Sequence, residues 1–101
     1  MNWYQQGDVL IRPARIPAKA QPKEGRTLAK GEATGHAHVV EGEAELLALG
    51  EKLFLRVLAG DVRVVHDEHG PISLPPGDYE VGRVREYDHF AEAPASQPVR
   101  D

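Results

Sequence analysis

Cysteine is absent from the 101-residue sequence, which excludes disulfide bonds, thiolate zinc sites, iron–sulfur clusters and cysteine nucleophiles. Any bound metal ion must therefore be held by histidine, aspartate or glutamate. Aromatic residues are also scarce, at 6 % of the chain, which disfavours an aromatic base-stacking surface. The only serines are Ser73 and Ser96, and neither lies in the Gly-x-Ser-x-Gly motif of a serine hydrolase.

Positive charge is in deficit. Lys and Arg total 12 against 16 Asp and Glu, which gives a formal charge of -4. A protein that binds the phosphates of nucleic acid through counterion release carries positive charge instead. No apolar run approaches the roughly 20 residues of a membrane span, and the first residues, Met1–Gln6, lack the charged-then-apolar order of a signal peptide. We expect no nucleic-acid partner, no membrane partner and a cytoplasmic location, or a virion location for a phage-derived protein.

The spacing of glycine and proline predicts one small all-β domain. The 10 glycines and 8 prolines separate short apolar runs, which is typical of strands and turns rather than helices. We expect a single antiparallel sandwich or barrel of about eight short strands within residues 1–90. Residues 91–101 are expected to form a flexible C-terminal tail, because they have little to bury. The expected strands are residues 8–12, 26–30, 35–40, 44–49, 52–58, 62–66, 71–74 and 79–87.

Two connections and one alternative complete the predicted fold. Pro13 is expected to stop the first strand, and the segment Pro13–Gly25 is expected to cross the surface with little contribution to the core. Gly50–Glu51 has the form of a two-residue type II′ hairpin loop. Residues 41–49 have apolar side chains so densely spaced that a helix is the alternative to a strand there.

Histidine is the residue type that points to a functional site. Four of the five histidines fall into two close pairs, and the members of the first pair share one face of a strand because strand side chains alternate. The second pair flanks a predicted hairpin turn. Neutral imidazole together with a carboxylate suits Zn, Ni, Mn or Fe, and we expect one of these divalent metals as the cofactor. The predicted metal ligands are His36, His38, His66 and His69.

Other residues near the pairs leave two interpretations open. Asp67 or Glu68 would add a carboxylate to a metal site, whereas His89 is expected at the surface. In the structural interpretation the first pair flanks an exposed strand and the second belongs to a solvated hairpin tip. The sequence does not show whether the two pairs meet in space.

The predicted function is a binding or structural role with divalent metal binding, ahead of catalysis. No nucleophile, oriented general base or phosphate loop can be assembled from the sequence. The alternative is a homo-oligomeric assembly protein without metal, such as a phage or cell-surface component. It is motivated by the small core and the strand edges, which subunit pairing would cover. We expect a homo-oligomer and leave any small-molecule ligand unspecified.

Two segments resemble the motifs of the cupin family. Residues 31–38 and 70–77 are similar to the motifs with which these small β-barrels hold a metal, using a His-x-His pair, a glutamate and a later histidine. The resemblance implies His36 and His38 as ligands, and a metalloenzyme of unknown substrate as a third function. Glu41 follows His38 after two residues where the cupin motif has three or four, and Glu80 occupies the position of the later histidine.

A second resemblance covers nearly the whole chain as far as Tyr87. The segments Gly7–Leu10, Thr34–His38 and His66–Ile72 resemble the Gly-Asp-Val-Leu, Thr-Gly-His-x-His and His-x-Glu-His-x-Pro-Ile motifs of a group of short bacterial and phage β-proteins of uncharacterised function. This resemblance supports the domain boundaries and implies no activity.

Overall fold

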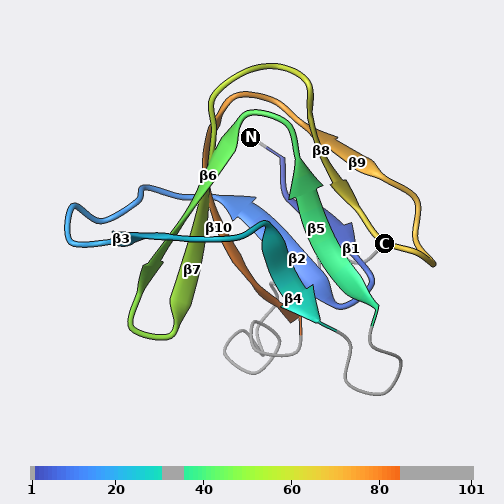
Figure 1. The fold of residues 1–101 in the computed structure, drawn as a ribbon, viewed down its shortest axis with the longest axis horizontal. Helices are drawn as coiled ribbons and strands as arrows, with labels where there is room; N and C mark the ends of the chain where they lie inside the picture. Colours follow the sequence, from blue (N-terminus) through green and yellow to red (C-terminus); the bar gives the residue numbers. More distant parts are fainter. Residues whose placement is uncertain (1, 31–35, 85–101) are drawn as a thin grey trace.

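The computed structural model describes residues 2–30 and 36–84, which form ten short strands in two antiparallel sheets (Figure 1). The predicted small all-β domain, an antiparallel sandwich or barrel, is confirmed, and the two sheets make it a sandwich. The larger sheet has the strand order β1-β2-β10-β7-β6-β3 and the smaller one β4-β5-β8-β9. The strands are β1 (Tyr4–Gln6), β2 (Val9–Pro13), β3 (Gln21–Lys23), β4 (Thr27–Lys30), β5 (Ala37–Glu41), β6 (Ala44–Leu49), β7 (Lys52–Val57), β8 (Val62–Val65), β9 (Ile72–Leu74) and β10 (Gly77–Arg83).

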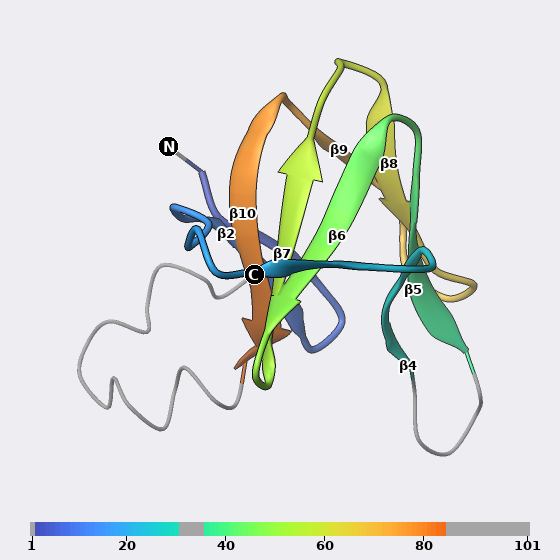
Figure 2. The same cartoon turned by 60° about the vertical axis from the view of Figure 1, so that its left-hand side comes forward.

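The main hydrophobic core lies between the sheets, which face each other in Figure 2 with β5 on one side and β10 on the other. Successive side chains of a strand point to opposite faces, so alternate residues of a strand enter this core. In β8, Val62 and Val64 are fully buried and Arg63 between them is exposed. The buried side chains of this core are Val9, Ile11, Leu28, Val40, Leu46, Leu55, Val57, Val62, Val64, Leu74, Tyr79 and Val81.

A second, smaller core corrects the prediction for the segment between β2 and β4. This segment was expected to contribute little, but Ile16 and Ala20 are each only 9 % exposed and pack with Leu47 and Phe54. Leu46 and Leu55, the strand neighbours of those two residues, belong to the main core. Strands β6 and β7 are therefore buried on both faces, which explains the dense apolar run that also fitted a helix.

All eight expected strands are present, with ends that differ by a few residues, and two further strands were missed. β1 contains Tyr4–Gln6 and pairs with β2, whereas β3 contains Pro22 and pairs with β6 at an edge of the sheet. Proline is tolerated there because an edge strand need not donate every backbone hydrogen bond. Pro13 is the last residue of β2, in register with Tyr79.

The predictions for the last strand and the C-terminal tail fall only partly within the described residues. β10 ends at Arg83, whereas the last strand was expected to reach Tyr87. Residues 85–101, which include His89 and the expected tail, lie outside the described part of the chain, as do residues 31–35 of the first histidine motif.

The predicted Gly50–Glu51 hairpin loop is confirmed. Leu49 pairs with Lys52, so the loop has two residues, and Gly50 has a φ of 62°. Among the described residues no non-glycine has a positive φ, so Glu51 has the negative φ that a type II′ turn requires.

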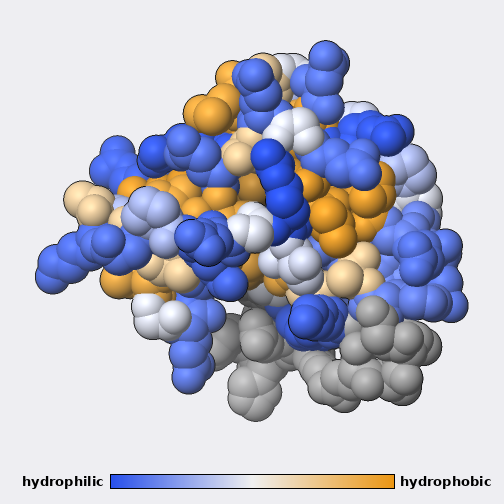
Figure 3. Space-filling view, viewed as in Figure 1, coloured by the Kyte–Doolittle hydropathy of each residue, from blue (hydrophilic) through white to orange (hydrophobic). Residues whose placement is uncertain are grey.

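The surface is mixed in polarity. On the face seen in Figure 3, hydrophobic side chains are visible between hydrophilic ones. Within the described ranges, the large hydrophobic residues that are exposed are Trp3 and Leu58. Within residues 2–30 and 36–84, no helix has the length and apolar character needed to cross a membrane.

The second core gives a stability prediction. Ile16→Ala removes a buried side chain that closes one face of β6 and β7, so we expect the free energy of unfolding to fall by about 2 to 4 kcal/mol. Leu58→Ala is the matched control, because Leu58 is 52 % exposed. Urea unfolding should show a loss of less than about 1 kcal/mol for that control. Equal losses in the two variants would mean that the segment before β3 is not part of the core.

Candidate metal centre

The four predicted ligand histidines come from two adjacent strand ends. His36 directly precedes β5 and His38 lies within it, whereas His66 directly follows β8 and His69 lies in the loop before β9. The antiparallel pair Val39–Val65 sets the start of β5 beside the end of β8 (Figure 1). This register brings both histidine pairs to the same end of the four-stranded sheet, which the sequence left open.

The imidazole rings form one continuous cluster, called here the histidine cluster (His36, His38, His66 and His69). His66 is central to it. The centroid of its ring lies 4.3 Å from that of His38, 4.6 Å from that of His69 and 5.7 Å from that of His36. The rings of His38 and His69 are nearly parallel, with centroids 6.1 Å apart.

His38 is the buried member of the cluster, with 5 % of its surface exposed. The pKa of His38 is lowered from 6.5 to about 4, chiefly because burial penalises the charged form. Nearby His66 and His69 contribute to this lowering, while the carboxylate of Asp8 opposes it. His38 is therefore neutral at physiological pH, which is the form of imidazole that binds metals.

Gln6, which sequence reasoning missed, connects His38 to the rest of the site. Its side chain is buried at the end of β1, and its Oε1 lies 2.8 Å from Nδ1 of His38. Its Nε2 donates to the carbonyl oxygens of Val64, at 3.0 Å, and Gly70, at 2.8 Å. No motif identified this residue, because β1 itself was not predicted.

The loop that carries the second histidine pair also brings two carboxylates to the cluster. The backbone N–H of Glu68 donates to Nδ1 of His66 at 3.0 Å. Asp67 Oδ2 lies 3.6 Å from Nε2 of His36, and Glu68 Oε2 lies 3.5 Å from its Nδ1. Both carboxylates expected near the site are thus beside the first histidine pair.

The turn between β1 and β2 covers the cluster at one point. Gly7 has a φ of 61°, which disfavours any side chain. A Cβ atom there would lie 2.7 Å from Nε2 of His69 and 3.4 Å from Cε1 of His38. Next to it, Asp8 forms an ion pair with Arg83 at 2.7 Å. Glycine therefore lets the backbone approach the two rings closely.

The side chains as they lie do not form a finished coordination sphere. Among residues 2–30 and 36–84, no group of three or more His, Asp or Glu side chains is arranged to hold a metal ion. The rings lie side by side, and Nδ1 of His66 is already engaged with a backbone N–H. Metal binding at this cluster would require rotation of at least some of the rings.

Two glutamates singled out by the cupin resemblance are each paired with an arginine. Glu41 Oε1 lies 3.4 Å from Arg63 Nη2 at the other end of β5, and both side chains are exposed. Glu80 Oε1 lies 2.6 Å from Arg12 Nη2 on the six-stranded sheet. Neither glutamate lies against the histidine cluster, whereas the carboxylates of Asp67 and Glu68 lie beside His36.

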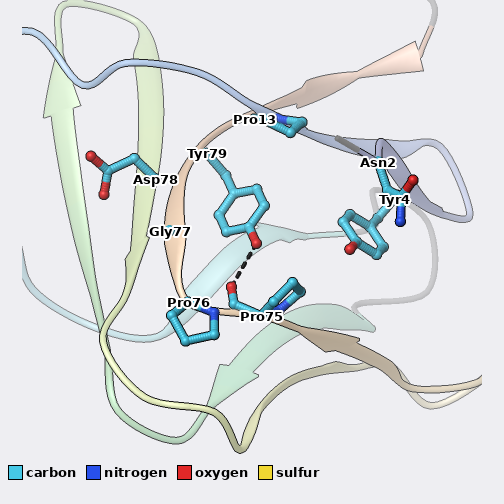
Figure 4. Close-up of a pocket in the computed structure, with 8 residues that line it drawn as sticks. All are labelled: Asn2, Tyr4, Pro13, Pro75, Pro76, Gly77, Asp78 and Tyr79. Carbon is cyan, nitrogen blue, oxygen red and sulfur yellow. Dashed lines mark hydrogen bonds between the residues drawn. The ribbon is translucent and has the colours of Figure 1, made fainter.

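A shallow pocket of about 240 Å³ lies away from the cluster, at the end of β2 and the start of β10 (Figure 4). Its floor is Tyr79, whose hydroxyl donates to the carbonyl oxygen of Pro75 at 2.6 Å. The ring of Tyr4 packs edge-on against that of Tyr79, with centroids 6.3 Å apart. The carboxylate of Asp78 is paired with Arg56 at 3.2 Å, so this pocket offers mainly ring and proline surfaces.

The lowered pKa of His38 predicts how stability depends on pH. Between about pH 6.5 and about pH 4 the unfolded chain binds more protons at this residue than the folded chain. Its contribution favours the folded state fully above pH 6.5 and is lost as the pH falls towards 4. Urea unfolding in the presence of a chelator should therefore show a smaller pH dependence in His38→Gln than in the wild-type protein. Identical pH dependences would contradict this assignment.

Gly7 gives a second prediction with a matched control. Gly7→Ala and Gly50→Ala both place a side chain at a φ of about 61° to 62°, so each should cost about 1 kcal/mol or more of stability. A Cβ at Gly50 meets nothing within 4 Å, whereas one at Gly7 displaces His69. We expect only Gly7→Ala to shift the imidazole NMR signals of His69 and His38. Unchanged signals in Gly7→Ala would contradict the close approach.

The comparison with protein families covers almost all of the described fold. Residues 5–84 match the family described as Domain of unknown function (DUF8820). The match begins within β1 and ends directly after β10, so it contains the whole histidine cluster together with Gln6. No curated protein and no solved structure matches the chain. The chain belongs to the DUF8820 family, a domain of unknown function.

Proposed function

We propose that this domain is a small binding module whose histidine cluster takes up one divalent transition-metal ion. The observation that carries the proposal is the contact of four imidazole rings from separate parts of the chain at one end of a sheet. A solvated hairpin tip would not require this contact. The proposed ligands are drawn from His36, His38, His66 and His69, with Asp67 and Glu68 beside them.

The ring separations support a shared ion. Two imidazoles on one tetrahedral zinc ion, with Zn–N bonds of about 2.0 to 2.1 Å, have ring centroids roughly 5 Å apart. The centroid distances in the cluster run from 4.3 to 6.1 Å, on both sides of that value. Rotation about side-chain torsions, rather than movement of the strands, is then the change that metal uptake demands.

Burial differs among the rings in a way that suits this rotation. His38 is buried and fixed by Gln6, so it supplies a preorganised neutral donor. His69 is exposed, and His36 and His66 are partly exposed, so their rings have room to turn towards an ion. A mainly imidazole donor set favours Zn and Ni over Mn, which suits carboxylate and water ligands better.

A binding role is proposed ahead of catalysis. The shallow pocket at Tyr79 lies apart from the cluster and offers no oriented nucleophile or base. Catalysis would require an open coordination position and a substrate site next to the ion. Homo-oligomeric assembly without metal is the alternative outcome of the experiment below.

The direct test is a calorimetric titration of untagged, chelator-treated protein with Zn²⁺ and, separately, with Ni²⁺. We expect about one ion per chain. His38→Ala should weaken binding by more than about 100-fold, because even outer-shell partners of metal ligands are worth about 10- to 100-fold. His89→Ala is the matched control and should bind like the wild-type protein, since His89 is not among the proposed ligands.

Two results would contradict the proposal. One is the absence of saturable binding of either ion to the wild-type protein. The other is equal binding by wild-type protein and His38→Ala, which would place the ion elsewhere. Light scattering on the same samples then tests assembly: a metal-free oligomer would favour the assembly role.

A further inference from the structure

We infer that Gln6 is the positioning residue of the histidine cluster, because it holds His38 in the tautomer whose Nε2 carries the free electron pair. The inference concerns the metal-free protein and deepens the proposed function, on which its metal-binding consequence rests. Three steps carry it: the orientation of the Gln6 amide, the proton on His38 and the opposite tautomer of His66.

The orientation of the Gln6 side chain follows from its partners. One end of the Gln6 amide lies 3.0 Å from Val64 O and 2.8 Å from Gly70 O. This end must be the NH₂ group, because both partners are carbonyl oxygens, which only accept hydrogen bonds. The other end is then Oε1, which faces His38. These two bonds leave the amide no freedom to turn over.

The tautomer of His38 follows from that orientation. Oε1 of Gln6 has no hydrogen, so the 2.8 Å bond requires Nδ1–H of His38 to donate. His38 is buried, and a neutral imidazole carries only one ring proton, which this bond places on Nδ1. Its Nε2 therefore presents an electron pair, and the arrangement matches the usual one for ligand histidines, whose second nitrogen donates to an oxygen.

His66, the neighbour of His38, is held in the opposite way. Its Nδ1 accepts the backbone N–H of Glu68 at 3.0 Å, so Nδ1 carries no proton in this arrangement. His66 can bind an ion through Nδ1 only by giving up that bond. The two rings, with centroids 4.3 Å apart, thus offer different nitrogen atoms: Nε2 of His38 and Nδ1 of His66.

An amide is suited to this position for a physical reason. Gln6 is 3 % exposed and faces two carbonyl oxygens as well as the histidine, so its partners need a group that both donates and accepts. A carboxylate would set like partial charges against Val64 O and Gly70 O unless it took up a proton. A methionine has a similar length but neither donates nor strongly accepts.

These differences define the experiment. Gln6→Met removes the acceptor for His38 and both donors, whereas Gln6→Glu removes the donors but keeps an acceptor for Nδ1–H. Gln21→Met is the control, since Gln21 of β3 is exposed and its side chain donates to Lys19 O at 3.3 Å. Long-range ¹H–¹⁵N NMR of each metal-free protein reports the ring tautomers, and Zn²⁺ calorimetry reports the affinity.

For the wild-type protein and for Gln21→Met we expect His38 to carry its proton on Nδ1. Gln6→Glu should keep that tautomer and bind zinc within about tenfold of the wild type, whereas Gln6→Met should lose the single tautomer and bind about 10- to 100-fold more weakly. A purely structural role for Gln6 predicts instead that both Gln6 variants lose affinity equally, because both lose the bonds to the two carbonyls.

The NMR measurement on the wild-type protein separates this inference from the proposed function. A proton on Nε2 of His38 in the metal-free protein would overturn the inference, even if zinc binds. A proton on Nδ1 in a protein that binds no zinc would uphold the role of Gln6 in fixing the ring and overturn the metal-binding function. Neither result depends on the folding of a variant.

Discussion

One buried amide joins the three segments from which the histidine cluster is made. Gln6, at the end of β1, donates to the backbone at the end of β8 and in the loop before β9, and it bonds to His38 in β5. Val64 and His38 are buried, so leaving the polar groups that face Gln6 on these two residues unsatisfied would cost free energy. We infer that the orientation of His38 depends on this residue, and the rings of His66 and His69 lie beside that of His38.

The strand pairing of the sandwich brings the residues of the histidine cluster together. Antiparallel pairing of Val39 with Val65 fixes the relative position of two histidine pairs that are distant in the sequence. The β1–β2 turn then closes over them, because Gly7 admits the rings of His38 and His69 where a larger residue would collide. The result is a cluster of one buried imidazole and three more exposed ones with two carboxylates nearby, and these are the groups from which the proposed metal ligands are drawn.

Much of the fold follows from the sequence because alternation and turn chemistry are local. Val62 and Val64 alternate with exposed neighbours, and Gly50 opens a two-residue loop, so the strands around them were predicted correctly. β1 and β3 were missed because polar residues and Pro22 conceal them, and their pairing depends on neighbours across the sheet. Ile16 appeared to lie on a surface crossing because nothing local reveals the second buried face of β6 and β7.

The candidate site also has features that the sequence predicts and features that depend on the three-dimensional structure. The two histidine pairs are visible as spacing in the sequence, but their meeting depends on long-range register, and the role of Gln6 depends on hydrogen bonds to Val64 and Gly70. A single glutamine in a short polar strand carries no sequence signal for such a role. The interaction that organises the site is therefore the one that only the three-dimensional arrangement reveals.

In the proposed function, imidazoles of the histidine cluster bind one metal ion together. X-ray absorption at the zinc edge of the one-to-one zinc complex of untagged protein reports the ligands of the ion. We expect nitrogen and oxygen neighbours at about 2.0 to 2.1 Å together with outer-shell scattering from at least two imidazole rings. A first shell of oxygen without imidazole scattering would contradict it.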